Sequence, residues 1–199
     1  MRCACCSENA VYKCNVCGKP ICSEHVRLRP ICNTCASKSA AKYIVQKVAL
    51  LRDRKKIKEF AQLFWGEQEQ LTFDKVFTVA ELPAFVAKVG KEVAGFVSFA
   101  GMRNDLIVVA LGILPEYQGF GIGSSLIAKV EGEARKLRSK RILVSTSNDD
   151  LPALAFYQSL GFQIYEVKPN VIAEKHGGVM RGIGNLPIRD ELRLQKSID

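Results

Sequence analysis

A strand, a glycine-rich turn and a helix follow one another without a break in the middle of the chain. Leu106 to Leu114 is a nearly unbroken apolar run, which is typical of a strand buried on both faces of a sheet. Pro115 ends the run, and a turn with alternating glycines leads into Gly121–Lys140, where apolar residues recur at helical spacing. We therefore expect an α/β fold in which this helix packs against a central strand.

The segments on either side continue the alternation of strands and helices. A hairpin is expected from Ala84–Val89 and Glu92–Ala100, which flank the turn residues Gly90 and Lys91. The stretch Leu71–Leu82 is ambiguous between helix and strand. The other expected elements are strands at Tyr43–Val45, Arg141–Thr146, Phe162–Val167 and Arg189–Gln195, and helices at Arg52–Trp65 and Leu151–Leu160. This order predicts a mixed α/β sheet with helices on its faces.

Cysteine content and charge divide the chain into two parts. All eight cysteines lie in the first 35 residues, and residues 1–58 carry 13 Lys/Arg against 3 Asp/Glu, whereas residues 59–199 carry 16 against 17. We predict a small N-terminal domain at residues 1–37 and a larger domain at residues 42–199. No apolar run reaches the roughly 18 residues that a membrane span needs, and the N-terminus lacks the apolar core of a secretory signal. A cytoplasmic protein without membrane contact is therefore expected.

The turn from Gln118 to Gly123 is suited to hold an anion. Amides in the first turn of a helix have no partner within the helix and carry the positive end of its dipole. Glycines add no side chain that would keep a phosphate away from those amides. The turn therefore indicates a pyrophosphate site, although a Gly-x-Gly sequence taken alone is more often a simple tight turn.

The residues around this turn resemble the acetyl-CoA motif of the GCN5-related N-acetyltransferase (GNAT) superfamily. That motif has Gln or Arg, two residues, Gly, one residue, and Gly or Ala, and here it reads Gln118, Gly121 and Gly123. The preceding Leu-x-Ile-x-Pro at residues 111–115 also matches. Further on, Asn148 to Phe162 resembles the late motif of the superfamily, an Asn-rich turn followed by Ala, Phe-Tyr and Leu-Gly-Phe. The resemblance covers residues 42–199 and implies the GNAT-like acyl-CoA N-acyltransferase fold.

The resemblance also implies roles for particular residues. Backbone amides of residues 118–123, with Ser124, would hold the pyrophosphate of acetyl-CoA, and the strand end at Leu111–Ile113 would pair with its pantetheine arm. Tyr157 would protonate the departing thiolate as a general acid, although a tyrosine on a helix face is also a common core residue. Many members have Asn where this chain has Asp150, and Asn148 is the alternative contact. The implied acetyl-CoA contacts are Leu111, Gly112, Ile113, Gln118, Gly119, Phe120, Gly121, Ile122, Gly123, Ser124, Asn148, Asp150 and Tyr157.

The acceptor and the base are less well defined by the sequence. An amine would attack the thioester directly, so the reaction needs positioning and a proton acceptor rather than a covalent enzyme intermediate. Glu92, Asp105 and Glu116 lie near expected strand ends, but each is more often a surface charge, and a chain of waters is an equal alternative. We expect the acceptor loops at Glu67–Pro83 and Pro169–Pro187, and the sequence does not identify the amine.

The N-terminal cysteines form four pairs with a two-residue gap, one of which ends in histidine. Such a gap lets both side chains bind one metal ion, and eight ligands make two tetrahedral zinc sites. The pairs fit an interleaved arrangement, in which the first and third share a zinc ion, and also a sequential one, and Cys5 is left over. The pattern is similar to cross-brace zinc fingers of the B-box and HIT types. The predicted zinc ligands are Cys3, Cys6, Cys14, Cys17, Cys22, His25, Cys32 and Cys35.

These features lead to one main hypothesis about function and one alternative. The main hypothesis is an N-acetyltransferase that moves acetyl from acetyl-CoA to an amine, with a zinc module that recruits the substrate or a partner. The alternative is a non-catalytic acetyl-CoA sensor whose zinc module binds DNA or protein. The basic N-terminal region would attract nucleic acid or an acidic protein, and the zinc module is also a candidate for joining two copies into a homodimer.

Overall fold

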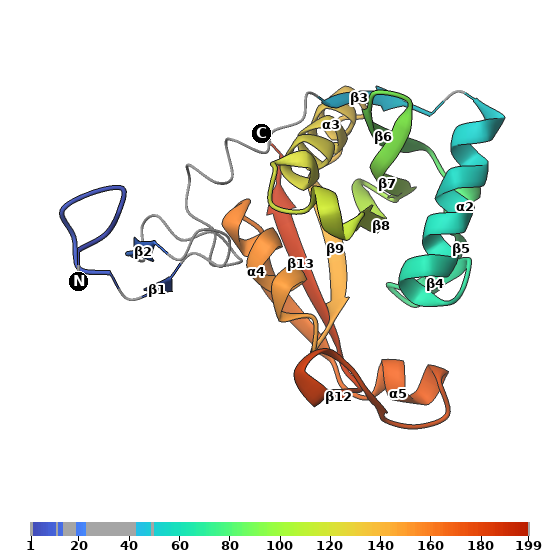
Figure 1. Cartoon of the computed structure of the whole chain (residues 1–199). Coiled ribbons are helices and arrows are strands. Elements are labelled where there is room, and N and C mark those ends of the chain that lie inside the picture. The colour runs from blue at the N-terminus through green and yellow to red at the C-terminus, as the bar shows by residue number, and fades with distance from the viewer. Residues whose placement is uncertain (1, 11, 14–18, 23–42, 49, 199) are drawn as a thin grey trace.

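The computed structural model describes residues 2–10, 12–13, 19–22, 43–48 and 50–198 (Figure 1). In the N-terminal part, β1 (Tyr12–Lys13) and β2 (Pro20–Ile21) pair as a short antiparallel ladder. From β3 onward the described residues form one large sheet with helices on both faces. None of the helices in these ranges is long and apolar enough to cross a membrane.

The large sheet has seven strands in the order β10-β13-β9-β8-β7-β6-β3. Neighbouring strands are antiparallel except β8 and β9, which run parallel, so the predicted mixed sheet is confirmed. A parallel pair needs a crossover connection, and the helix α3 supplies it between β8 and β9. The strands are β3 (Tyr43–Lys47), β6 (Ala84–Val89), β7 (Glu92–Met102), β8 (Asp105–Ile113), β9 (Arg141–Ser147), β10 (Gln163–Lys168) and β13 (Glu191–Ser197).

Helix α2 covers one face of the sheet, and helices α3 and α4 cover the other (Figure 1). Phe60 of α2 packs with Phe96 of β7 in one buried cluster, whereas Leu126 of α3 and Tyr157 of α4 belong to the second. Each fully buried side chain of this size contributes about 1.5–3 kcal/mol, so the apolar stripes hold the helices in place. The helices are α2 (Leu51–Trp65), α3 (Ile122–Lys136) and α4 (Leu151–Ser159).

The ambiguous stretch Leu71–Leu82 belongs to a hairpin that leads into a short helical turn. Its strands β4 (Glu69–Thr72) and β5 (Lys75–Thr78) are joined by Phe73 and Asp74, both with positive φ (51° and 60°). Such turns usually carry Asn or Gly, so the residue types gave no sign of it. The helical turn is η2 (Val79–Glu81). The chain also forms elements that the sequence left as loop: α5 (Val171–Lys175), β11 (Met180–Arg181), η4 (Ile183–Asn185) and β12 (Pro187–Ile188).

Several expected boundaries differ from those observed by one to four residues, and two of the differences have a clear cause. The helix expected to reach Lys140 ends at Lys136, because Leu137 caps it and Arg138 takes a left-handed conformation (φ 54°). The last strand begins at Glu191 rather than Arg189, because the side chain of Asn148 binds the backbone amides of residues 189 and 190. The first change comes from a local backbone conformation and the second from a contact between distant residues, and periodicity reports neither.

Candidate active site

The parallel strands β8 and β9 separate halfway along their length. They pair from Asp105 opposite Arg141 to Val108 opposite Val144, and the pairing stops there. On its other side, β8 stays paired with β7 as far as Ile113, with a bulge at Val109. Along residues 109–113, the side of β8 that faces β9 therefore has no strand partner. An extended ligand can bind this free edge through main-chain hydrogen bonds, as an added strand does.

The glycine turn follows this free edge and opens α3. The 3₁₀ turn η3 (Pro115–Tyr117) ends β8, and Gly119 and Gly121 take φ values of 88° and 80°, in the left-handed region that favours glycine. The first hydrogen bond of the helix runs from the amide of Ser125 to the carbonyl of Gly121 at 3.0 Å. The amides of residues 122–124 thus precede the helical ladder, and the first turn carries no acidic residue. This end of α3 is suited to bind an anion.

Two residues of the turn also have structural roles. The side-chain amide of Gln118 donates to the carbonyl of Ile113 at 2.9 Å, which ties the turn to the end of β8. A Cβ atom at Gly123 would stand 3.0 Å from the ring of Phe156, so glycine here lets α4 pack closely on the start of α3. The motif is therefore required by packing as well as by a ligand.

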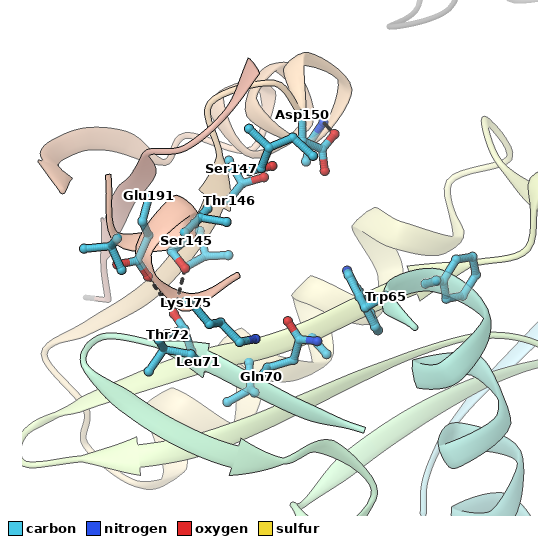
Figure 2. A pocket seen from close by; sticks show the side chains of 18 of the residues that line it. Trp65, Gln70, Leu71, Thr72, Ser145, Thr146, Ser147, Asp150, Lys175 and Glu191 are labelled. Atoms are coloured by element: carbon cyan, nitrogen blue, oxygen red, sulfur yellow. Dashed lines mark hydrogen bonds between the residues drawn. The ribbon is translucent and has the colours of Figure 1, made fainter. Parts of the chain in front are cut away.

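A cavity of about 360 Å³ opens where the strands separate (Figure 2). Its lining comes from the end of α2, from β4, from the two parted strands, and from α4 and α5. Figure 2 shows Trp65 across the cavity from Thr72, Ser145 and Glu191. The two expected acceptor loops meet here: Glu67, the first residue of one loop, forms an ion pair with Lys175 of α5 in the other. Sequence reasoning placed neither loop next to the other.

Tyr157 lines this cavity and is also a core residue. Only 6% of it is exposed, and its ring packs edge-on between Phe156 and Phe162, with centroids at 5.2 and 5.6 Å. Burial raises the pKa of the Tyr157 phenol above its ordinary value, and the nearby Asp150 carboxylate adds to the shift. A phenol with a raised pKa keeps its proton at neutral pH, so Tyr157 is in the protonated form that a general acid needs.

The structure separates the two residues that the sequence offered as alternative contacts. Asp150 lines the cavity and caps α4 by accepting from the amide of Ala153 at 3.0 Å. Burial raises the pKa of the Asp150 carboxyl. Asn148 lies outside the cavity lining, and its side chain accepts from the amides of Arg189 and Asp190 and donates to a carbonyl at position 187. These bonds fix the segment before β13.

Two of the carboxylates weighed as bases, Glu92 and Asp105, are not among the residues that line the cavity. Asp105 is bound by Arg141 at 2.6 Å, and Glu92 accepts from the hydroxyl of Tyr117 at 3.1 Å. Sequence reasoning placed Thr72 in an expected acceptor loop but missed the polar set at the cavity in which Thr72 contacts both Ser145 and Glu191. No sequence signal joined these three residues, because they lie in one expected loop and in two strands that are far apart in the chain.

Comparison with known proteins identifies the family. Residues 50–162 match the model described as the acetyltransferase (GNAT) family. An uncharacterized protein, YdhI of Bacillus subtilis, is 31% identical over 147 residues, which cover 71% of this chain and 90% of YdhI. The chain belongs to the GNAT acetyltransferase family.

Two other GNAT comparisons bear on the site. The L-amino acid N-acyltransferase MnaT of Escherichia coli is 23% identical over 122 residues, which cover 56% of this chain and 71% of MnaT. A Bacillus subtilis acetyltransferase solved in complex with CoA shares the fold, with a TM-score of 0.61 and 17% identity, over 79% of this chain and 100% of that one. The free strand edge and glycine turn therefore occur in a fold that is known with CoA bound.

The matched GNAT residues do not include the cysteine-rich segment. There the thiols of Cys3, Cys6 and Cys22 lie within 4.8 Å of one another. Burial opposes ionisation of Cys3, but hydrogen bonds from neighbouring backbone amides outweigh it and lower the pKa of its thiol to about 6. Cys5 is exposed and stands outside the group. The other predicted zinc ligands, which are Cys14, Cys17, His25, Cys32 and Cys35, lie outside the described residues.

Proposed function

We propose that this chain transfers the acetyl group of acetyl-CoA to the amino group of a small molecule. The observation that carries the proposal is the free edge of β8, which runs from the cavity to the glycine turn at the start of α3. A ligand with a pyrophosphate at one end and an extended amide-containing arm would fit these two features in succession. Its thioester end would then lie at the cavity beside Tyr157.

The proposed roles follow from the position of each group. The amides of residues 119–124 bind the pyrophosphate, and the backbone of Leu111–Ile113 binds the pantetheine arm and orients the thioester carbonyl. The acceptor nitrogen attacks the carbonyl carbon, so a C–N bond forms as the C–S bond breaks. Tyr157 donates its proton to the departing thiolate, and the amine nitrogen releases one to water.

Cavity size and the nature of its walls favour a small acceptor. A volume of about 360 Å³ is at the lower end of the range for ligand sites, and it must also accommodate the thioester. Trp65 and Leu71 offer apolar contact, whereas Ser145 and Asp150 offer polar contact near the reacting position. The name of MnaT, an L-amino acid N-acyltransferase, makes amino acids the first acceptors to test.

The test is transfer of radiolabelled acetyl from acetyl-CoA to a panel of L-amino acids, small alkyl and aryl amines, and a short peptide. Thiol reagents are unsuitable because the chain itself has eight cysteines. We expect transfer to a small amine, and Tyr157→Phe should lower kcat about 100-fold while acetyl-CoA affinity is kept. Tyr165→Phe is the matched control, since Tyr165 is a partly exposed tyrosine of β10 outside the cavity. Binding of acetyl-CoA with no transfer to any amine would favour the sensor alternative.

For the N-terminal segment we propose a zinc site made by Cys3, Cys6 and Cys22, with His25 as the fourth ligand. The support is the proximity of these three thiols, because a sequential arrangement would group the first cysteine pair with Cys14 and Cys17 instead. Such a module, close to the basic residues of the N-terminal third, would recruit an acidic partner or nucleic acid.

Metal analysis of the purified chain is expected to find two zinc ions per chain. NMR of the cadmium-substituted protein should couple one cadmium to Cys3, Cys6 and Cys22 together. Coupling of Cys3 and Cys6 to the same cadmium as Cys14 would contradict the interleaved arrangement. Cys5→Ser should leave the metal content unchanged, because Cys5 stands apart from the thiol group.

A further inference from the structure

Three polar side chains from distant parts of the chain meet at one end of the cavity. Thr72 of β4 lies between Ser145 of β9 and Glu191 of β13 (Figure 2). Its hydroxyl oxygen is 2.6 Å from Oγ of Ser145 and 3.1 Å from Oε1 of Glu191. All three residues are among those that line the cavity, but Thr72 and Glu191 are buried, whereas Ser145 is partly exposed.

The surroundings of Glu191 decide which way the first hydrogen bond runs. Oε1 also accepts from the backbone amide of Phe73 at 3.3 Å, and Oε2 accepts from Nε of Arg193 at 2.9 Å. Arg193 holds Glu191 as an ion pair, so the carboxylate is an acceptor on both oxygens. The bond between Thr72 and Glu191 must therefore use the hydroxyl hydrogen of Thr72.

This direction fixes the hydroxyl group of Ser145 in turn. A hydroxyl has one hydrogen, and that of Thr72 is already given to Glu191. The contact of 2.6 Å between Thr72 and Ser145 then requires Ser145 to be the donor. Oγ of Ser145 is left with lone pairs alone to offer to the cavity, so it can accept a hydrogen bond from a ligand but cannot donate one.

Ser145 stands at the point where the two strands separate. It directly follows Val144, the last residue of β9 that pairs with β8. The free edge of β8 begins at the same level, and both lie in the lining of one cavity. A group bound to Ser145 would therefore face the position where the proposed acetyl-CoA thioester ends.

We propose that Oγ of Ser145 accepts a hydrogen bond from the attacking amino group, and that Thr72 and Glu191 are positioning residues that keep Ser145 in this acceptor state. The inference rests on the proposed acetyl transfer. An N–H held by Ser145 leaves the lone pair of the nitrogen free to face the thioester carbon. As the C–N bond forms and the C–S bond breaks, positive charge grows on the nitrogen, and the hydrogen bond to Ser145 strengthens. The proton then leaves to water in the cavity, while Tyr157 protonates the thiolate.

A double-mutant cycle on kcat/KM tests the inference, with the best acceptor of the amino acid and amine panel as substrate. Ser145→Ala should lower kcat/KM about 10- to 100-fold, which is the range for a hydrogen bond to a charged group. Thr72→Val, a change of similar shape, should lower it about fivefold, because the Ser145 hydrogen is no longer held away from the cavity. Thr72→Ser keeps the hydroxyl and should restore activity to within about twofold of the wild type.

The decisive measurement is Thr72→Val in the Ser145→Ala background. If Thr72 acts through Ser145, the second change should then lower kcat/KM by less than about twofold, with the melting temperature tracked for all variants. Equal losses from Thr72→Val in both backgrounds would show a merely structural role and overturn the inference, leaving acetyl transfer intact. A wild-type chain that acetylates no amine of the panel would overturn the proposed function and this inference together.

Discussion

Gly121 and Gly132 offer a matched pair of substitutions on a single helix. Gly121 caps the N-terminus of α3 at φ 80°, whereas Gly132 lies inside the same helix without a positive φ. A Cβ at Gly121 would meet the hydroxyl oxygen of Tyr43 at 3.6 Å, which is ordinary contact, and a Cβ at Gly132 would meet nothing within 4 Å. The same chemical change, glycine to alanine, therefore differs only in backbone conformation at the two sites.

The two changes should have opposite signs. Alanine in the left-handed region costs about 1–2 kcal/mol, so Gly121→Ala should lower the free energy of unfolding by that amount. Alanine inside a helix is favoured over glycine by about 0.8–1.0 kcal/mol, so Gly132→Ala should raise it. The variants should then differ by about 2–3 kcal/mol, or by about 5–10 °C in melting temperature for a chain of this size.

Thermal unfolding by circular dichroism and calorimetric titration with CoA check both consequences. Gly121→Ala should also weaken CoA binding, because the amides of the turn rotate away from the pyrophosphate, whereas Gly132→Ala should bind CoA as the wild type does. Equal melting temperatures for the two variants would refute the argument from backbone strain. A destabilised Gly121→Ala variant that binds CoA normally would remove the turn from the proposed cofactor site.

Three further outcomes are expected. Asp150→Asn keeps the cap of α4. Burial raises the native pKa of Asp150, so the free energy of unfolding of the wild type should fall as pH rises above the ordinary carboxyl pKa of 3.8. Urea unfolding should therefore show the variant as stable as the wild type at low pH and more stable near neutrality. Asn148→Ala should lower unfolding free energy by about 2–4 kcal/mol, since two amides and one carbonyl lose their partner. Because burial raises the pKa of Tyr157, its phenol should stay protonated between pH 7 and about 10, so its ionisation should not lower kcat measured across that range.

The elements with strong periodicity were predicted from the sequence. The apolar run of β8, the stripe of α3 and the hairpin across Gly90 all occur where the pattern indicated them. Apolar burial is read directly from residue type and spacing, so these features need no knowledge of the rest of the chain. The same holds for the turn at Gly121, where a positive φ requires glycine.

The acceptor side of the cavity could not be predicted in this way. Phe73 and Asp74 form a hairpin turn without the usual residues, and Phe73 is held there by its burial under the guanidinium of Arg193, 4.9 Å from the ring centre. Thr72 and Glu191 are 119 positions apart, and only the assembled sheet brings them together. The direction of the hydrogen bond between Ser145 and Thr72 depends on both of these residues, so no local sequence pattern predicts it.

The separation of β8 and β9 affects how the sequence of such a protein can diverge in evolution. The groups proposed to hold the cofactor are main-chain amides and carbonyls, which every residue type supplies, so drift in side chains such as Leu111 or Ile113 leaves those groups in place. The opposite wall is made of individual side chains from α2, β4 and α5, where a single replacement alters shape and charge. Acceptor preference can therefore diversify while the cofactor stays the same.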